Sequence, residues 1–133
     1  MNKTIVLFAI AVTGLLPSCA HLGSSSGTRP GNVEHVVLVW LNEPGNVQVK
    51  GRIIETARTF PREIPGILSL SVGDAVPSPR DVVDDSFDLG LVVRFRDKAA
   101  MNAYEKHPVH VKAVKEVLAP NVSKLKVYDV MVR

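Results

Sequence analysis

A short segment near the C-terminus, Tyr104-Glu105-Lys106-His107-Pro108-Val109-His110, contains the side chains best suited to chemistry. Proline is favoured at the first position of a helix, so Pro108 places His110 in a first helical turn. The free amide groups and the dipole of that turn disfavour a positive charge, so the His110 imidazole should be neutral and able to accept a proton. Tyr104 could donate a hydrogen bond to a developing enolate or carbonyl oxygen. This pair would suit proton abstraction beside a carbonyl, with no cofactor and no metal.

The same residues also have structural explanations. His107 could simply cap the helix that follows it. His110 could hydrogen-bond a backbone carbonyl while its ring packs, and Tyr104 could be a core residue with its hydroxyl at the edge. Two histidines three residues apart could hold a metal, but no Cys or carboxylate is placed to complete the set, so we predict no metal site. His35 could line the same cavity or pair with the last strand.

Hydrophobic periodicity predicts the elements that position these residues. Alternating or continuous apolar runs indicate strands, and apolar residues on one helical face indicate helices. We expect strands at residues 33–41, 67–76, 87–95 and 125–132, and helices at 47–62 and from Asp97, an N-cap, to Pro120 with an interruption at Pro108. The last turn of the first helix should end at Pro61 and Pro65-Gly66. The order predicts an α+β domain of ferredoxin-like β-α-β-β-α-β topology over residues 32–133.

Such a sheet has one face that its helices leave bare. Two helices cover one side of four strands, yet the first strand is apolar at nearly every position and should be covered on both sides. An exposed apolar face of that size is typical of an interface. We therefore expect a homodimer in which two sheets face each other and enclose a shared α+β barrel, and we expect this barrel to be the ligand chamber.

The N-terminus has the pattern of an export signal. Residues 1–18 combine Lys3 with an apolar run that is too short for a permanent membrane span. The Leu16-Pro17-Ser18-Cys19 sequence resembles a bacterial lipobox, which predicts lipidation of Cys19, although Ser18-Cys19-Ala20 also fits ordinary cleavage after Ala20. Residues 19–31 are rich in Gly and Ser and should form a flexible tether. The expected location is the membrane-anchored, periplasmic or cell-envelope face; the alternative is a secreted soluble protein.

Composition excludes one class of partner. The 133 residues include 16 Lys and Arg against 13 Asp and Glu, a formal charge of +3, and no block of like charge stands out. Aromatic residues make up 5% of the chain and do not interleave with basic ones. This pattern is not that of a nucleic-acid-binding surface.

Several segments together resemble one family, the stress-responsive A/B barrel (Dabb) domain. They are His35 to Trp40, Ile64-Pro65-Gly66, Asp88 to Phe95, Tyr104 to His110 and Val127-Tyr128-Asp129. The resemblance covers residues 32–133 and implies a dimeric α+β barrel. One enzyme of this family, plant olivetolic acid cyclase, closes a polyketide by aldol condensation with a Tyr and a His. Those roles would fall on Tyr104 and His110, but an exported protein does not suit a polyketide substrate.

The sequence leaves two functions open. One is binding of a small, largely apolar molecule, with possible lyase or cyclase chemistry by His110 and Tyr104. The other is a non-catalytic envelope dimer that contributes to stress tolerance. We name His35, His107, Trp40 and Arg94 as candidate ligand-binding residues. A cavity reached by both Tyr104 and His110 would favour the first function, and a filled core would favour the second.

Overall fold

The computed structural model describes residues 27–133. The predicted signal peptide, Cys19 and most of the predicted tether lie outside the described residues. Within residues 27–133, no helix is long and apolar enough to cross a bilayer.

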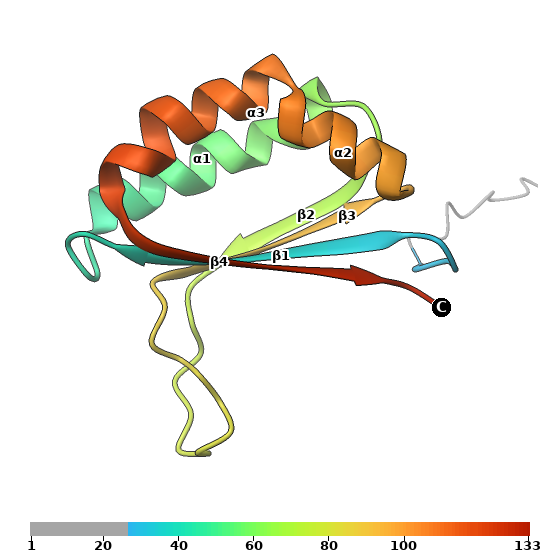
Figure 1. Ribbon diagram of the computed structural model, residues 1–133. Helices are drawn as coiled ribbons and strands as arrows, with labels where there is room; N and C mark the ends of the chain where they lie inside the picture. Colours follow the sequence, from blue (N-terminus) through green and yellow to red (C-terminus); the bar gives the residue numbers. More distant parts are fainter. Residues whose placement is uncertain (1–26) are drawn as a thin grey trace, which may run out of the picture.

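Four strands and their connecting helices follow the predicted order. The strands are β1 (Val33–Leu41), β2 (Ile67–Gly73), β3 (Leu89–Phe95) and β4 (Val122–Met131). The helices are α1 (Val47–Glu63), α2 (Lys98–Lys106) and α3 (Pro108–Ala113), and α3 continues into a π-helical turn, η1 (Val114–Leu118), and a 3-10 turn, η2 (Ala119–Asn121). The sheet order is β2-β3-β1-β4, with every neighbouring pair antiparallel. All helices lie on one side of the sheet (Figure 1). The ferredoxin-like α+β fold is confirmed.

Strand alternation decides which residues face the helices. On β3, the alternate residues from Leu89 to Phe95 are buried, while Val92 is 41% exposed on the opposite, open face. Register extends this alternation to the neighbouring strands, because His35 of β1 lies opposite Val93 of β3 and Asp129 of β4. His35 and Asp129 therefore lie side by side on the helix-covered face.

Helix α1 begins at a side-chain cap and ends one residue later than predicted. The Asn46 side chain accepts a hydrogen bond from the Val49 amide at 3.0 Å, which is the usual role of Asn at an N-cap. Pro61 lies inside the helix, which continues to Glu63, so the expectation that Pro61 helps to end it is wrong. A proline in the last turn removes only one intrahelical hydrogen bond.

Gly66 allows helix α2 to approach the start of β2. Its φ is 91°, a conformation that side chains with a Cβ rarely adopt. A Cβ at this position would also lie 2.6 Å from the Cβ of Ala100 on α2. The Pro65-Gly66 turn therefore needs glycine for both conformation and space.

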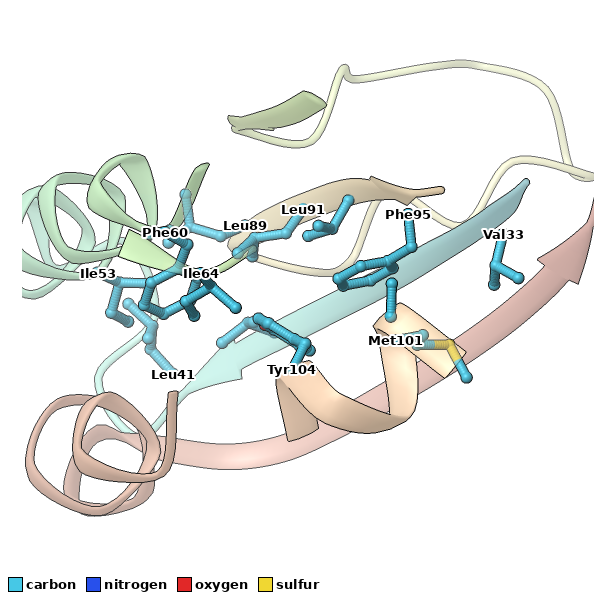
Figure 2. Close-up of a cluster of buried hydrophobic side chains, with 14 residues drawn as sticks. Val33, Leu41, Ile53, Phe60, Ile64, Leu89, Leu91, Phe95, Met101 and Tyr104 are labelled. Atoms are coloured by element: carbon cyan, nitrogen blue, oxygen red, sulfur yellow. The ribbon is translucent and has the colours of Figure 1, made fainter. Parts of the chain in front are cut away.

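The core fills the layer between the sheet and the helices. Its most enclosed side chains are Phe95, Leu89, Val39 and Val93, all on the two central strands. In Figure 2, Val33, Phe95 and Met101 gather toward one end of this layer, and Ile53 and Phe60 lie toward the other.

Four strand ends differ from the prediction, two of them on β4, which runs from Val122 to Met131 instead of residues 125–132. Strand β2 ends at Gly73 rather than residue 76, and β3 begins at Leu89 rather than residue 87, because residues 74–88 leave the sheet. This loop projects on the side away from the helices (Figure 1). Its last residue, Asp88, accepts hydrogen bonds from the amides of Leu41 (2.8 Å) and Gly45 (2.6 Å), which tie the start of β3 to the β1–α1 turn.

Candidate functional site

A cavity of about 420 Å³ lies between the sheet and the helices of one subunit. Most of its lining is aliphatic, and its polar side chains are His35, Thr56, Tyr104, Glu105 and His110. The lining residues are His35, Val37, Val39, Ile53, Thr56, Ala57, Phe60, Leu91, Tyr104, Glu105, His110, Ala113, Val114, Val117, Leu118, Leu125 and Val127. The cavity therefore combines an apolar wall with one small group of acid–base side chains.

The location of this cavity corrects one prediction. We expected the chamber against the bare face of the sheet, between two subunits, but Tyr104 and His110 open into a cavity on the helix-covered face. The physical reason is that β4 lies at the sheet edge with few residues packed over it: Leu125 and Val127, which face the helices, are each 44% exposed. Space is left between this edge and the helices.

The π-helical turn contributes the wall opposite β4. The Ala119 amide donates to the carbonyl of Val114, five residues earlier, rather than to the usual fourth residue. Val114, Val117 and Leu118 all line the cavity. Turns of this kind are rare and often occur at functional sites. The sequence predicted a helical run here but not its wider turn.

His110 is positioned as a neutral proton acceptor. Pro108 is at the first position of α3, as predicted, and His110 Nδ1 lies 3.3 Å from the carbonyl oxygen of Glu105. A carbonyl can only accept, so this contact assigns the proton of the neutral ring to Nδ1 and leaves Nε2 as an acceptor. Burial lowers the pKa of His110 and outweighs the opposing effects of the Glu105 carbonyl contact and the Glu105 charge, while the nearby His35 and His107 act in the same direction as burial.

Tyr104 is held by its ring, while its hydroxyl is free to donate. The ring centroid lies 4.1 Å from that of His110 and 4.9 Å from that of Phe95. Burial, and secondly the negative charge of Glu105, raise the pKa of Tyr104, so the phenol stays protonated. Its hydroxyl makes no hydrogen bond with any described residue, and it is not among the fully enclosed atoms that lack a partner. The hydroxyl therefore remains accessible in the cavity.

The sequence left open whether His35 lines the cavity or pairs with the last strand, and in the structure it does both. It lines the cavity, and its Nδ1 lies 2.6 Å from Oδ1 of Asp129 on the last strand. Its ring is 5.8 Å from that of Tyr104 in an edge-to-face arrangement. Asp129 was not among the predicted site residues. The signal that could have identified it is a carboxylate two residues after Val127, on the face of the strand that points inward.

Three predicted ligand-binding residues do not reach this cavity. His107 caps α3, since its Nδ1 accepts a hydrogen bond from the Val109 amide at 3.3 Å. Trp40 and Arg94 face the open side of the sheet. The Trp40 indole donates to Ser86 Oγ at 3.0 Å, and Arg94 Nε lies 2.6 Å from Glu34 Oε1. A ligand-binding role for these three residues would require a different site.

The part of the chain that the structure describes contains no group of three or more His, Cys, Asp or Glu side chains placed to hold a metal ion. His107 and His110 are also separated in role, because one caps the helix and the other faces the cavity.

Solved structures share this fold at low sequence identity. A ferredoxin-like Dabb family protein from Mesorhizobium loti is 23% identical with a TM-score of 0.64, covering 77% of this chain and 98% of its own. A dimeric ferredoxin-like protein of unknown function from Bacteroides fragilis is 24% identical with a TM-score of 0.64, covering 77% and 97%. The hydroxynitrile lyase of Passiflora edulis is 17% identical with a TM-score of 0.68, covering 79% and 96%. No curated protein sequence matches the chain.

The family comparison agrees with the fold and with the segments singled out in the sequence. The model of the stress-responsive A/B barrel domain matches residues 33–132, which begin with β1 and end just after β4. The chain therefore belongs to the stress-responsive A/B barrel (Dabb) family.

Proposed function

We propose that this protein binds a small, largely apolar carbonyl compound in the cavity between its sheet and helices, and transfers a proton beside the carbonyl without a cofactor. His110 Nε2 is the general base, and Tyr104 Oη donates a hydrogen bond to the carbonyl oxygen. When the base removes a proton from the adjacent carbon, negative charge develops on that oxygen, where the phenol stabilises it. An aldol-type cyclisation begins with a step of this kind. Cleavage by a lyase of the hydroxynitrile type instead begins with removal of the hydroxyl proton, which the same base would accept.

The single observation that carries the proposal is the convergence of Tyr104 and His110 in a cavity instead of a filled core. Their ring centroids are 4.1 Å apart, and both line the 420 Å³ space. A volume of this size accommodates a small organic ligand.

The charge of the lining supports a neutral ligand. Glu105 is the one Asp, Glu, Lys or Arg residue among the cavity-lining residues. A site for a carboxylate or a phosphate usually presents Arg or Lys to it. The aliphatic wall formed by residues such as Val37, Leu118 and Val127 favours an apolar body on the same ligand.

One structural neighbour supports the lyase direction. The Passiflora edulis protein of the same fold is a hydroxynitrile lyase. At 17% identity the likeness supports the fold, and the proposal for this chain rests on its own cavity.

The test is deuterium incorporation next to a carbonyl. The purified protein is incubated in D₂O with phenylacetone, a neutral apolar ketone, and exchange at the α-carbon is followed by NMR. We expect exchange above the buffer rate, and loss of that excess in His110→Asn. His107→Asn is the matched control, because Asn is also a good N-cap and His107 lies outside the cavity. Equal exchange in His110→Asn and the native protein would refute the role of His110.

The protein is further proposed to be a homodimer formed through the open face of the sheet. Val92 on the central strand β3 is 41% exposed on this face, and Tyr128 and Val130 on the edge strand β4 are 50% and 53% exposed. Structural neighbours from Bacteroides fragilis and Thermobifida fusca are described as dimeric. Sedimentation should give a dimer for the native protein and a monomer for Val92→Glu. Val47→Glu, 75% exposed at the start of α1, should leave the dimer intact.

Export and anchoring through Cys19 are part of the same proposal. The lipobox-like sequence supports them, and a tethered domain would be held on the envelope face of a membrane. We expect palmitate labelling of the native protein that is lost in Cys19→Ser. Labelling that persists in Cys19→Ser would contradict anchoring through Cys19, and absence of labelling in the native protein would favour the secreted alternative. A protein that is dimeric but binds no ketone and shows no exchange would favour the non-catalytic envelope function.

A further inference from the structure

The loop of residues 74–88, named the β2–β3 arm from here on, has features that the cavity and its chemistry do not explain. It connects β2 to β3 through 15 residues that form no helix or strand. It projects from the sheet on the side away from the helices (Figure 1). Loops of this length are uncommon in compact domains, and those that are ordered usually have a function.

Hydrogen bonds give the β2–β3 arm a defined shape. Asp85 Oδ2 accepts from the Ser78 amide at 2.8 Å, which joins the outgoing half of the arm to the returning half. The Val83 amide donates to the carbonyl of Arg80 at 2.9 Å and closes a turn at the tip. At the base, Ser86 Oγ accepts from the indole of β1 at 3.0 Å. Because the arm is held in this way, it would lose little conformational entropy on binding another molecule.

The tip of the arm presents apolar and acidic side chains to its surroundings. Val82 and Val76 are 89% and 78% exposed, the two largest exposed fractions among the large hydrophobic side chains of residues 27–133. Asp81, next to Val82, is exposed and has no hydrogen-bond or ion-pair partner among the residues that the structure describes. A single exposed apolar residue is ordinary, but two on an ordered projection favour contact with another molecule.

The charge of the arm indicates which molecule it fits. Residues 74–88 contain five Asp and one Arg, a net charge of −4. The rest of residues 27–133 contains 14 Lys and Arg against 8 Asp and Glu, a net charge of +6. The acidic arm is therefore complementary to the basic body of a second copy of this domain. The same negative charge disfavours a membrane surface with anionic lipids.

A dimer formed through the open face brings that second copy within reach of the arm. Sheets that pack face to face lie about 10 Å apart. A loop that runs out and back over 15 residues can extend about 20 Å from its sheet. The arm projects on the open side, so in such a dimer it reaches beyond the interface and lies beside the partner subunit (Figure 1).

We propose that the β2–β3 arm is a clasp that holds the partner subunit through Val82 and Asp81 at its tip. This inference rests on the proposed homodimer, and it adds a contact outside the two sheet faces. A two-fold axis repeats the contact, so each subunit clasps the other. Interface contacts act mainly on the rate of dissociation, so the clasp should slow the separation of the subunits.

The first test measures how fast the subunits exchange. Dimers labelled with ¹⁵N are mixed with unlabelled dimers, and the appearance of mixed dimers is followed by native mass spectrometry. The double variant Asp81→Lys, Val82→Ser should exchange about 10-fold faster than the native protein, as expected for the loss of an important interface contact. The matched control is Glu55→Lys, Val47→Ser. It makes similar changes at exposed positions of α1, on the other side of the sheet, and should exchange at the native rate.

The second test identifies what the tip contacts. When p-benzoylphenylalanine replaces Val82, irradiation of a mixture of ¹⁵N-labelled and unlabelled chains should link peptides from two different chains. The same probe in place of Val47 should link no subunits. Native exchange in the arm variant, or links from position 82 only within one chain, overturns the clasp while the proposed dimer stands. A native protein that sediments as a monomer overturns the dimer and the clasp together.

Discussion

Replacing Tyr104 with Phe separates the role of the hydroxyl from that of the ring. The Tyr104 side chain is 4% exposed, and its ring contacts Phe95, Phe60 and His110 at centroid distances of 4.9, 5.9 and 4.1 Å. Phe preserves the ring and these contacts. The hydroxyl has no partner among the described residues, so its removal leaves no other polar group unpaired.

The structure therefore predicts a large effect on chemistry with little effect on stability. A net hydrogen bond contributes about 0.5–1.5 kcal/mol, and this hydroxyl makes none, so the free energy of unfolding should change by less than about 1 kcal/mol. Loss of one donor to a developing oxyanion typically slows a reaction about 100- to 1000-fold. Tyr104→Ala removes the ring as well and should cost about 3–5 kcal/mol of stability.

The assay pairs urea unfolding with deuterium exchange of phenylacetone. Val47→Ala is the control, because Val47 is 75% exposed at the start of α1 and does not line the cavity, so both measurements should stay unchanged. Native exchange in Tyr104→Phe would show that the hydroxyl has no part in the reaction. If the free energy of unfolding of the same variant falls by more than about 2 kcal/mol, the hydroxyl has a structural role, which would contradict the inference that it makes no hydrogen bond within the protein.

The α-carbon exchange rate should rise with pH through an apparent pKa below the ordinary 6.5 of histidine, because burial lowers the pKa of His110 and only the neutral ring accepts a proton; a midpoint above 6.5 would contradict this. Because the pKa of His110 is lowered in the folded state, the unfolded chain binds a proton at this residue more readily than the folded chain does, and stability should fall as the pH drops below about 6.5. His110→Asn should therefore make the urea midpoint less dependent on pH in this range. Gly66→Ala should lower the free energy of unfolding by more than the about 1–2 kcal/mol that a positive φ costs a residue with a Cβ, because the new Cβ would also overlap that of Ala100. Gly31→Ala is the control in thermal unfolding: Gly31 has a φ of 89° but nothing within 4 Å, so only the conformational cost should appear. Asp88→Ala should lower the urea unfolding free energy by about 1–3 kcal/mol, because two backbone amides of the β1–α1 turn lose their acceptor, and an unchanged midpoint would refute that role.

Much of the fold could be predicted because its strands carry strong local signals. The alternation on β3 and the apolar run of β1 fix which residues face the helices, and Asp97 caps α2 as its position suggested. The ends of β2 and β3 were misplaced because apolar residues such as Val76 and Phe87 continue the alternation after the chain has left the sheet. Pairing between strands, which a single segment does not encode, decides where a strand ends.

The site was predicted in part. The spacing of Tyr104, Pro108 and His110 identified two residues that the structure brings together, because they belong to one local segment. Asp129 was missed, since its contact with His35 depends on the register of strands 94 positions apart. The position of the cavity was also missed, because the distance between a sheet and its helices depends on packing along the whole layer.

The measurement that tests the central claim most directly is a crystal structure of the protein with phenylacetone bound. The claim predicts the ketone in the cavity between sheet and helices, with its oxygen within hydrogen-bond distance of Tyr104 Oη and its α-carbon facing His110 Nε2. A cavity filled by side chains, or a ketone bound only on the open face near Trp40 and Arg94, would contradict it.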